Sequence, residues 1–303
     1  MITDIFVVRH HGVPTNESWY PGAPSTNLRR FDLSAAIQFC ERMDSMLFLE
    51  TPFNWDLIPY CRGHGIKTCL VTMYECTPIM HPEPDLYICP SLLDLQYFHG
   101  SSKVFLPLPV EYPWKQKIKV EEYIHNGGYL GLRGREGTVL LIEAMEHVKS
   151  PIKLTIRVQE NVAPAYQRKM AADRRITYIA ATVPYEELYS SGDACVAPQK
   201  FNGCSLPLQE ARASGMLVMT TDRFPMSTWL PRTPLIPVRG YQKARIGGAY
   251  MEFDEALVDP RDIARKIDEW YQQDITEYSL SGKRWAEENS WEVLKPRYLD
   301  ALA

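Results

Sequence analysis

One stretch, residues 194–221, constrains the fold more than any other part of this 303-residue chain. It runs from Ala-Cys-Val-Ala through a polar, glycine-containing loop to Leu-Pro-Leu-Gln-Glu-Ala-Arg-Ala-Ser-Gly, and ends in the apolar run 217–220. Pro207 is tolerated in the first turn of a helix and Gly215 is a common helix stop, so the stretch predicts a strand, a loop, a short helix and a strand. In a parallel sheet such a loop lies at the carboxyl ends of the strands, where ligands bind and a helix N-terminus offers N–H groups to an anion.

Strands and helices alternate through the rest of the chain, which predicts an α/β fold with mainly parallel sheets. A proline- and lysine-rich stretch, residues 107–119, interrupts the alternation and indicates a linker. We therefore expect two Rossmann-like domains, with the following divisions: an N-terminal domain over 1–112, a linker over 113–125, a C-terminal domain over 126–290 and a final helix over 291–303.

Each half begins with a predicted strand, over 5–8 in the first half and over 127–132 in the second. A polar, aromatic loop over 9–30 follows the first strand, and it is too long to be a simple connector. Beyond residue 224 the pattern predicts little until a helix over 260–272, which is followed by a helical stretch interrupted near Asn289.

Composition excludes several classes of protein. The chain is 45% hydrophobic and 23% charged, as globular proteins are, and its net charge of -4 gives no global footprint for a polyanion. The seven cysteines are odd in number and lack a Cys-x-x-Cys pair, which indicates buried thiols in a reducing cytoplasm. No apolar run reaches the ~18 to 20 residues of a membrane span, and the N-terminus lacks a signal-peptide pattern. We expect a soluble cytoplasmic protein without a metal site.

Two features suggest a ligand when taken together. Gly131-Leu-Arg-Gly-Arg-Glu-Gly137 follows a predicted strand and precedes a helix, and Arg133 and Arg135 could bind a phosphate bidentately. On its own it could equally be a turn with two solvated arginines. Glu210 lies early in the helix predicted within the stretch 194–221. There it could accept both hydroxyls of a ribose, or it could simply stabilise the helix dipole. The combination predicts a nucleotide-diphosphate site.

The order of motifs over residues 126–300 resembles the GT-B retaining glycosyltransferases of glycosyltransferase family 4. The matching stretches are Ile176-Thr-Tyr-Ile-Ala-Ala, Glu186-Glu-Leu-Tyr, Gly192-Asp-Ala-Cys-Val-Ala-Pro, Asn202-Gly-Cys-Ser-Leu-Pro-Leu-Gln-Glu-Ala-Arg-Ala-Ser-Gly215 and Ser281-Gly-Lys-Arg-Trp-Ala-Glu-Glu-Asn-Ser-Trp291.

This resemblance implies two Rossmann-like domains with mainly parallel sheets on either side of a cleft, and a final helix over 291–303 that crosses back to the first domain. It implies transfer, with retention, of a glucose-like hexose from a nucleotide-diphosphate sugar such as UDP-glucose to a hydroxyl acceptor. No metal and no other cofactor are implied, and the leaving diphosphate helps to deprotonate the acceptor.

Two positions depart from the family pattern. Asn202 stands where the family has a glutamate near the donor sugar, and Glu136 stands where it has a lysine, so that the phosphate charge would fall on Arg133, Arg135 or Lys200. The donor-binding residues implied by the resemblance are Gly131, Arg133, Arg135, Lys200, Gly203, Cys204, Ser205, Leu206 and Glu210.

The N-terminal half supplies the acceptor-side candidates. Glu50 and Glu75 follow predicted strands, where a ligand crevice or simple solvation could account for them. Of the adjacent pair His10 and His11 only one can point into a cleft, and His11 is favoured because it precedes a glycine. The expected catalytic residues are His11, Glu75 and Asn202, and the expected acceptor-binding residues are Arg9, His10, Trp19, Tyr20 and Glu50.

The acceptor and the activity itself have alternatives at this point. The acceptor could be a glycan, a small molecule or DNA carrying a hydroxymethylated base, as in some phage enzymes. The basic residues that could line a cleft for DNA, or could be ordinary surface charge, are Arg9, Arg29, Arg30, Lys115, Lys117, Lys119 and Lys200. Asn202 and Glu136 also fit a catalytically weakened nucleotide-sugar or glycan-binding module. The oligomeric state is open.

Overall fold

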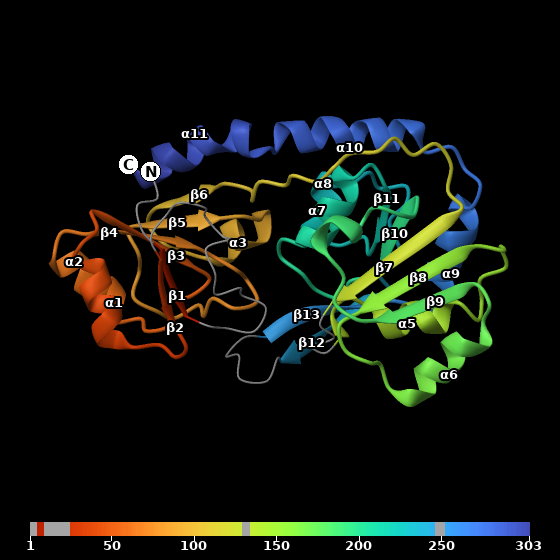
Figure 1. Cartoon of the computed structure of the whole chain (residues 1–303), viewed down its shortest axis with the longest axis horizontal. Coiled ribbons are helices and arrows are strands. Elements are labelled where there is room, and N and C mark those ends of the chain that lie inside the picture. Colours follow the sequence, from red (N-terminus) through yellow and green to blue (C-terminus); the bar gives the residue numbers. More distant parts are fainter. Residues whose placement is uncertain (1–4, 9–24, 129–133, 246–251) are drawn as a thin grey trace. The chain divides into compact units, whose positions relative to one another are not determined.

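The computed structural model describes residues 5–8, 25–128, 134–245 and 252–303 (Figure 1). The chain divides into two compact units. Unit 1 comprises Met1–Pro90, Asp94–Leu106 and Lys295–Ala303, and unit 2 comprises Ser91–Leu93 and Pro107–Leu294.

Unit 1 is built on a four-stranded sheet in the order β3-β4-β5-β6, in which every neighbouring pair is parallel. A second, two-stranded parallel pair joins β1 to β2. Buried side chains such as Ile58, Leu70 and Phe98 form one core cluster between the sheet and its helices. The elements are β1 (Ile5–Val8), β2 (Ser25–Leu28), α1 (Leu33–Cys40), β3 (Ser45–Leu49), α2 (Leu57–Gly63), β4 (Lys67–Val71), β5 (Leu86–Cys89), α3 (Leu92–Tyr97) and β6 (Lys103–Phe105).

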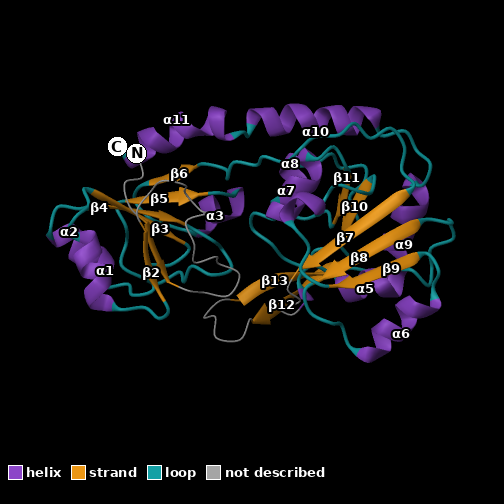
Figure 2. Cartoon of the chain, viewed as in Figure 1, coloured by secondary structure: helices purple, strands orange, loops and turns teal. Residues whose placement is uncertain are grey.

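Unit 2 contains a five-stranded parallel sheet in the order β11-β10-β7-β8-β9 (Figure 2). The chain moves outward from β7 through β8 to β9 and then returns to the other side of β7 for β10 and β11. The strand order therefore reverses between β7 and β10, and ligands bind beyond the carboxyl ends of the strands at such a switch point. The strands are β7 (Glu122–Gly128), β8 (Lys153–Val158), β9 (Ile176–Ala180), β10 (Ala194–Ala197) and β11 (Leu217–Thr220).

Helices cover both faces of this sheet. Val196 of β10 packs in a core cluster with side chains of α5 and α9, whereas its neighbours Cys195 and Ala197 pack with side chains of α7. This alternation is the two-residue period of a strand that is buried on both faces. The remaining elements are α5 (Thr138–Ala144), α6 (Pro164–Ala172), the 3-10 helix η2 (Tyr185–Glu187), α7 (Leu206–Ala213), α8 (Met226–Trp229), the hairpin β12 (Gly240–Arg245) and β13 (Glu252–Leu257), α9 (Pro260–Trp270), α10 (Thr276–Glu288) and α11 (Trp291–Leu302).

The predicted α/β alternation is confirmed, two local predictions were wrong, and one hairpin was missed. Of the strand expected over 127–132, residues 127 and 128 belong to β7, which begins earlier, at Glu122, and residues 129–132 lie outside the described part of the chain. The early start was missed because the buried residues of β7 include the polar His125, which interrupts the apolar pattern. The loop expected over 9–30 contains strand β2, whose sequence Ser-Thr-Asn-Leu has no apolar alternation. Hairpin β12–β13 was not predicted, because its strands are rich in charged and polar residues.

Candidate functional site

Two loops meet at the switch point of unit 2. One joins β7 to α5 through Gly134–Gly137, and the other joins β10 to α7. The Lys200 N–H donates to the Arg135 carbonyl at 2.7 Å. Gly137 has φ 75, and a Cβ there would lie 2.2 Å from the carbonyl oxygen of Pro198. Only glycine allows so close an approach at this φ, so Gly137 is what lets the two loops lie in contact.

The β10–α7 loop is fixed by its own side chains. The Asn202 Oδ1 accepts the Ser205 N–H at 2.7 Å, and Ser205 has φ 51 at the start of α7. The Ser205 hydroxyl donates to Gln199 Oε1 at 2.8 Å, and the Thr221 hydroxyl donates to the Gln199 carbonyl at 2.6 Å. Since the first-turn N–H groups of a helix lack intrahelical partners, this loop presents the N-terminus of α7 to the strand ends.

Gly203 and Cys204 complete this loop, and Leu206 begins the helix that follows it. Gln209 Nε2 donates to the Cys204 carbonyl at 2.7 Å, and Cys204 is half-buried. Leu206, the first residue of α7, is 38% exposed, so the start of the helix is accessible to a ligand.

His125 connects the two elements that adjoin these loops, β10 and α5. It is fully buried in β7, and its Nδ1 lies 2.7 Å from the Val196 carbonyl in β10. A carbonyl only accepts, so Nδ1 carries the hydrogen, and Nε2 accepts from the Thr138 hydroxyl of α5 at 2.8 Å. Burial lowers the pKa of His125 to about 4, so the imidazole is neutral at pH 7.

Glu210 lies in the second turn of α7. Its Oε1 accepts the Tyr185 hydroxyl at 3.0 Å and its Oε2 accepts the Tyr189 hydroxyl at 3.1 Å. Desolvation raises the pKa of the carboxyl, and the two phenol hydrogen bonds oppose that shift. The carboxylate is thus held by neutral donors, and each oxygen can accept one more hydrogen bond.

Arg135 and Lys200, the two predicted donor-binding cations that lie within the described residues, each lie beside a carboxylate. Arg135 Nε is 3.2 Å from Glu136 Oε1, and Lys200 Nζ is 3.1 Å from Glu255 Oε1. Both cations are mostly buried, with 22% and 25% of their side chains exposed. Glu136 also accepts from Gln199 Nε2 at 2.6 Å, so the departure from the family's lysine adds a bond between the loops.

In unit 1, the predicted residues Glu50 and Glu75 differ in accessibility. Glu75 is only 4% exposed, whereas Glu50 is exposed with φ 62 directly after β3. The Glu50 N–H donates to Val71 and its carbonyl accepts the Thr77 hydroxyl at 2.7 Å, which ties the loops after β3 and β4 together. The other predicted residues lie outside the described part of the chain: Arg9, His10, His11, Trp19, Tyr20, Gly131 and Arg133.

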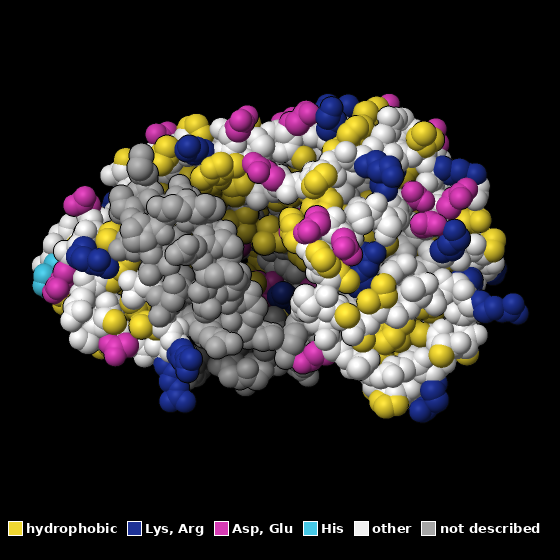
Figure 3. Space-filling view, viewed as in Figure 1, with side chains coloured by type: hydrophobic (Ala, Val, Ile, Leu, Met, Phe, Trp, Pro, Cys, Tyr) yellow, Lys and Arg dark blue, Asp and Glu magenta, His cyan; other side chains and the backbone are white. Residues whose placement is uncertain are grey.

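Charge is mixed on the visible surface of unit 2, where basic and acidic side chains are interspersed (Figure 3). Within the described ranges, no group of three His, Cys, Asp or Glu side chains could hold a metal ion. The helices of the same ranges include none that is long and apolar enough to cross a membrane.

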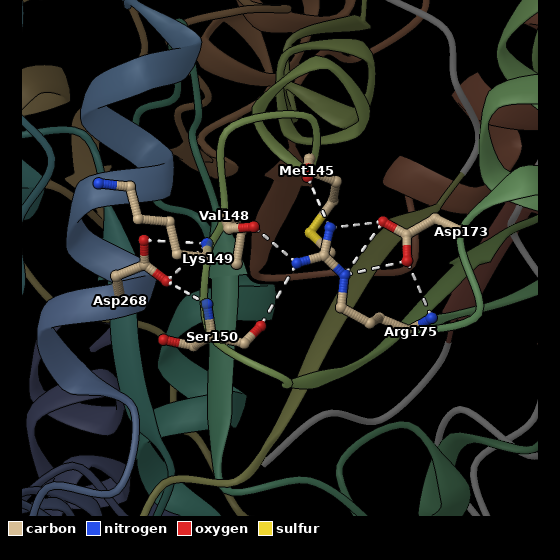
Figure 4. A network of polar contacts seen from close by, with 7 residues as sticks. All are labelled: Met145, Val148, Lys149, Ser150, Asp173, Arg175 and Asp268. Carbon is tan, nitrogen blue, oxygen red and sulfur yellow. Dashed lines mark hydrogen bonds and ion pairs between the residues drawn. The ribbon is translucent and has the colours of Figure 1, made fainter.

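A hollow of about 530 Å³ in unit 2 lies beside a network of hydrogen bonds around Arg175, and not beside the β7–α5 and β10–α7 loops. Arg175, which lines it, precedes β9 and donates to the carbonyls of Met145 at 2.7 Å and Val148 at 2.7 Å (Figure 4). Its guanidinium also pairs with Asp173 at 2.6 Å. Because this position is the amino end of a strand, the hollow lies opposite the edge where a parallel sheet binds ligands.

Sequence reasoning missed Tyr185, Tyr189 and His125 as parts of the site. The two tyrosines flank the Glu-Glu-Leu motif and are four residues apart. In a helix this spacing places two side chains on the same face, which could have indicated that they act together. His125 gave no signal, because its partners Val196 and Thr138 come from two other elements.

Comparisons with known proteins agree on the fold. No protein-family model and no curated protein sequence matches the chain. A glycosyltransferase from Rickettsia africae is similar in structure, with a TM-score of 0.70 at 11% identity over 97% of this chain and 88% of that one. Anabaena HepE, crystallised with UDP and glucose, gives a TM-score of 0.70 at 9% identity over 99% of both chains. Sucrose-phosphate synthase from Thermosynechococcus elongatus gives 0.65 at 13% identity over 98% and 87%.

The chain therefore has the GT-B fold of these structures, with two Rossmann-like domains built on parallel sheets. The fold class that the motifs implied is confirmed.

Proposed function

We propose that the chain is a retaining glycosyltransferase that moves a glucose-like hexose from a UDP-linked donor to a hydroxyl acceptor. The observation that supports this most is the meeting of the glycine turn, the N-terminus of α7 and Glu210 at one switch point. HepE, which has the same fold, is crystallised with UDP and glucose.

In this proposal unit 2 binds the donor. Glu210 accepts the two hydroxyls of the ribose, because adjacent hydroxyls match the two oxygens of one carboxylate. The diphosphate lies at the N-terminus of α7, near Gly203 to Leu206, and at the glycine turn that begins at Gly131. Arg133, Arg135 and Lys200 supply positive charge, the last two after exchanging a carboxylate partner for phosphate.

The protein's contribution to the chemistry is then positioning and electrostatic stabilisation of the leaving diphosphate, which accepts the acceptor's proton on the same face. Neither step needs a metal or another cofactor. We assign catalytic roles to His11, Glu75 and Asn202, and acceptor binding to Arg9, His10, Trp19, Tyr20 and Glu50. The first domain, 1–112, supplies the acceptor side. The chain works in the cytoplasm, where a reducing environment fits its free cysteines, five of which are buried.

One observation favours a second candidate, a nucleotide-sugar-binding module of low activity. The Asn202 Oδ1 is bonded to the backbone of its own loop at 2.7 Å, which gives this side chain a structural task at the family's glutamate position. The two candidates predict the same binding and different turnover.

Turnover with UDP- and GDP-sugars tests the proposal. The purified chain is incubated with each donor, with and without a panel of glycan, small-molecule and hydroxymethylated DNA acceptors, and release of nucleotide is measured. We expect release from a UDP-hexose above the level of a Glu210→Ala variant. Saturable UDP binding without release from any donor would select the binding module instead. An acceptor that is DNA would show a steep loss of binding with salt.

A further inference from the structure

The partners of Glu210 are two phenol hydroxyls, and they divide evenly between its oxygens. Tyr185 donates to Oε1 at 3.0 Å and Tyr189 donates to Oε2 at 3.1 Å. A carboxylate has about four lone-pair positions, so this arrangement leaves one on each oxygen. The two remaining positions are what a pair of adjacent hydroxyls requires.

The tyrosines are themselves held in place. Tyr112 packs edge-on to both rings, with centroids at 5.5 Å from Tyr185 and 5.1 Å from Tyr189. The Tyr112 hydroxyl accepts the Tyr189 N–H at 3.0 Å and donates to the Glu186 carbonyl at 2.7 Å. The side chain of Asn126, at the end of β7, hydrogen-bonds to Tyr189 and donates to the Leu188 carbonyl at 3.0 Å.

The surroundings of Glu210 contain no compensating cation among the described residues. Burial raises the pKa of its carboxyl, and the two phenol hydrogen bonds lower it. Arg212, on the same helix, has its guanidinium 4.8 Å from the Trp285 ring centroid. Cys195 of β10 interacts with Tyr189, and burial raises the pKa of that thiol to about 12, so it stays neutral. The two phenol hydroxyls are therefore the described groups that oppose the effect of desolvation on the Glu210 carboxylate.

We propose that Tyr185 and Tyr189 are positioning residues that hold the Glu210 carboxyl group in place, with one acceptor position left on each oxygen for the two hydroxyls of a ribose. This inference rests on the proposed function and deepens it, because it selects ribonucleotides over 2′-deoxyribonucleotides as donors. Replacing either tyrosine by phenylalanine removes one hydroxyl donor from the carboxylate and leaves the packing of the ring in place.

The experiment measures UDP affinity by calorimetry from pH 5 to 8 for the wild type, Tyr189→Phe and Tyr185→Phe. Tyr166→Phe is the matched control, because Tyr166 donates to a different carboxylate of the same unit, Glu143, at 3.2 Å. We expect Tyr189→Phe to bind UDP about 10-fold more weakly at pH 6, since a hydrogen bond to a charged group is lost. The pH midpoint of binding should rise by about one unit. Tyr166→Phe should match the wild type.

A second measurement follows the Glu210 carboxyl carbon by NMR without ligand, so that it does not depend on UDP binding. Its pKa should rise in both variants, and the exposed Tyr185 keeps the test available if Tyr189→Phe does not fold. An unchanged Glu210 pKa in the variants overturns this inference, whatever UDP does. Wild-type protein that does not bind UDP overturns the proposed function, while a raised pKa would still show that the phenols hold the carboxylate.

Discussion

The buried imidazole of His125 predicts a specific dependence of stability on pH. Its pKa is about 4 in the folded protein, against an ordinary 6.5. The unfolded chain therefore binds more protons between these values, and the stabilisation is complete above pH 6.5 and lost as the pH falls toward 4. At 1.36 kcal/mol for each pKa unit, the whole effect is about 3 kcal/mol of unfolding free energy, of which about 2 kcal/mol falls between pH 7 and pH 5.

The assay is urea unfolding at half-unit steps from pH 5 to 7, followed by the fluorescence of the tryptophans. His125→Gln keeps a donor and an acceptor in this position without a titrating ring, so its unfolding free energy should be flatter with pH than that of the wild type by about 2 kcal/mol. His147→Gln is the control, because that histidine is exposed. A wild-type slope retained in a folded His125→Gln variant would refute the reasoning.

Two substitutions with matched neighbours test other parts of unit 2. Gly137→Ala should lower the unfolding free energy by more than ~1 kcal/mol and weaken UDP binding, because a Cβ would lie 2.2 Å from the Pro198 carbonyl oxygen at φ 75. Gly134→Ala, at φ 63 with nothing within 4 Å, should cost less, and equal losses in urea unfolding would argue against the close approach. Arg175→Ala should cost ~1 to 3 kcal/mol of unfolding free energy, since the carbonyls of Met145 and Val148 and the carboxylate of Asp173 lose their donor. Arg174→Ala, on an exposed side chain, should stay within about 0.5 kcal/mol, and thermal unfolding that fails to separate the pair would contradict this.

The parts of the fold that sequence reasoning predicted are those with local signals. The unit over 194–221 has apolar runs bounded by proline and glycine, and its strands and helix lie where these residues predict them. Hairpin β12–β13 has no such signal, because its buried apolar residues Ala244, Phe253 and Ala256 are interspersed with charged ones. The pairing of the two strands depends on contacts with each other and with the rest of unit 2, and the sequence of one strand alone does not show these contacts.

The site divides in the same way. Glycine placement predicted that Gly137 and the loop after β10 matter, yet the contact between Gly137 and Pro198 joins residues far apart in the sequence. The partners of Glu210 lie in another element, so no spacing within α7 predicts them. The neutral state of His125 depends on its complete burial, and the presence of a histidine in a strand does not indicate that it is buried.

We propose that a nucleotide-sugar site lies at the switch point between β7 and β10, with Glu210 on the ribose. Calorimetric titration of UDP into the wild type and Glu210→Ala tests it most directly. We expect saturable binding to the wild type and at least about 10-fold weaker binding to the variant, because the hydrogen bonds to a charged acceptor are lost. The variant should remain folded at the temperature of the titration. Equal affinity of the two proteins, both folded, would contradict the claim.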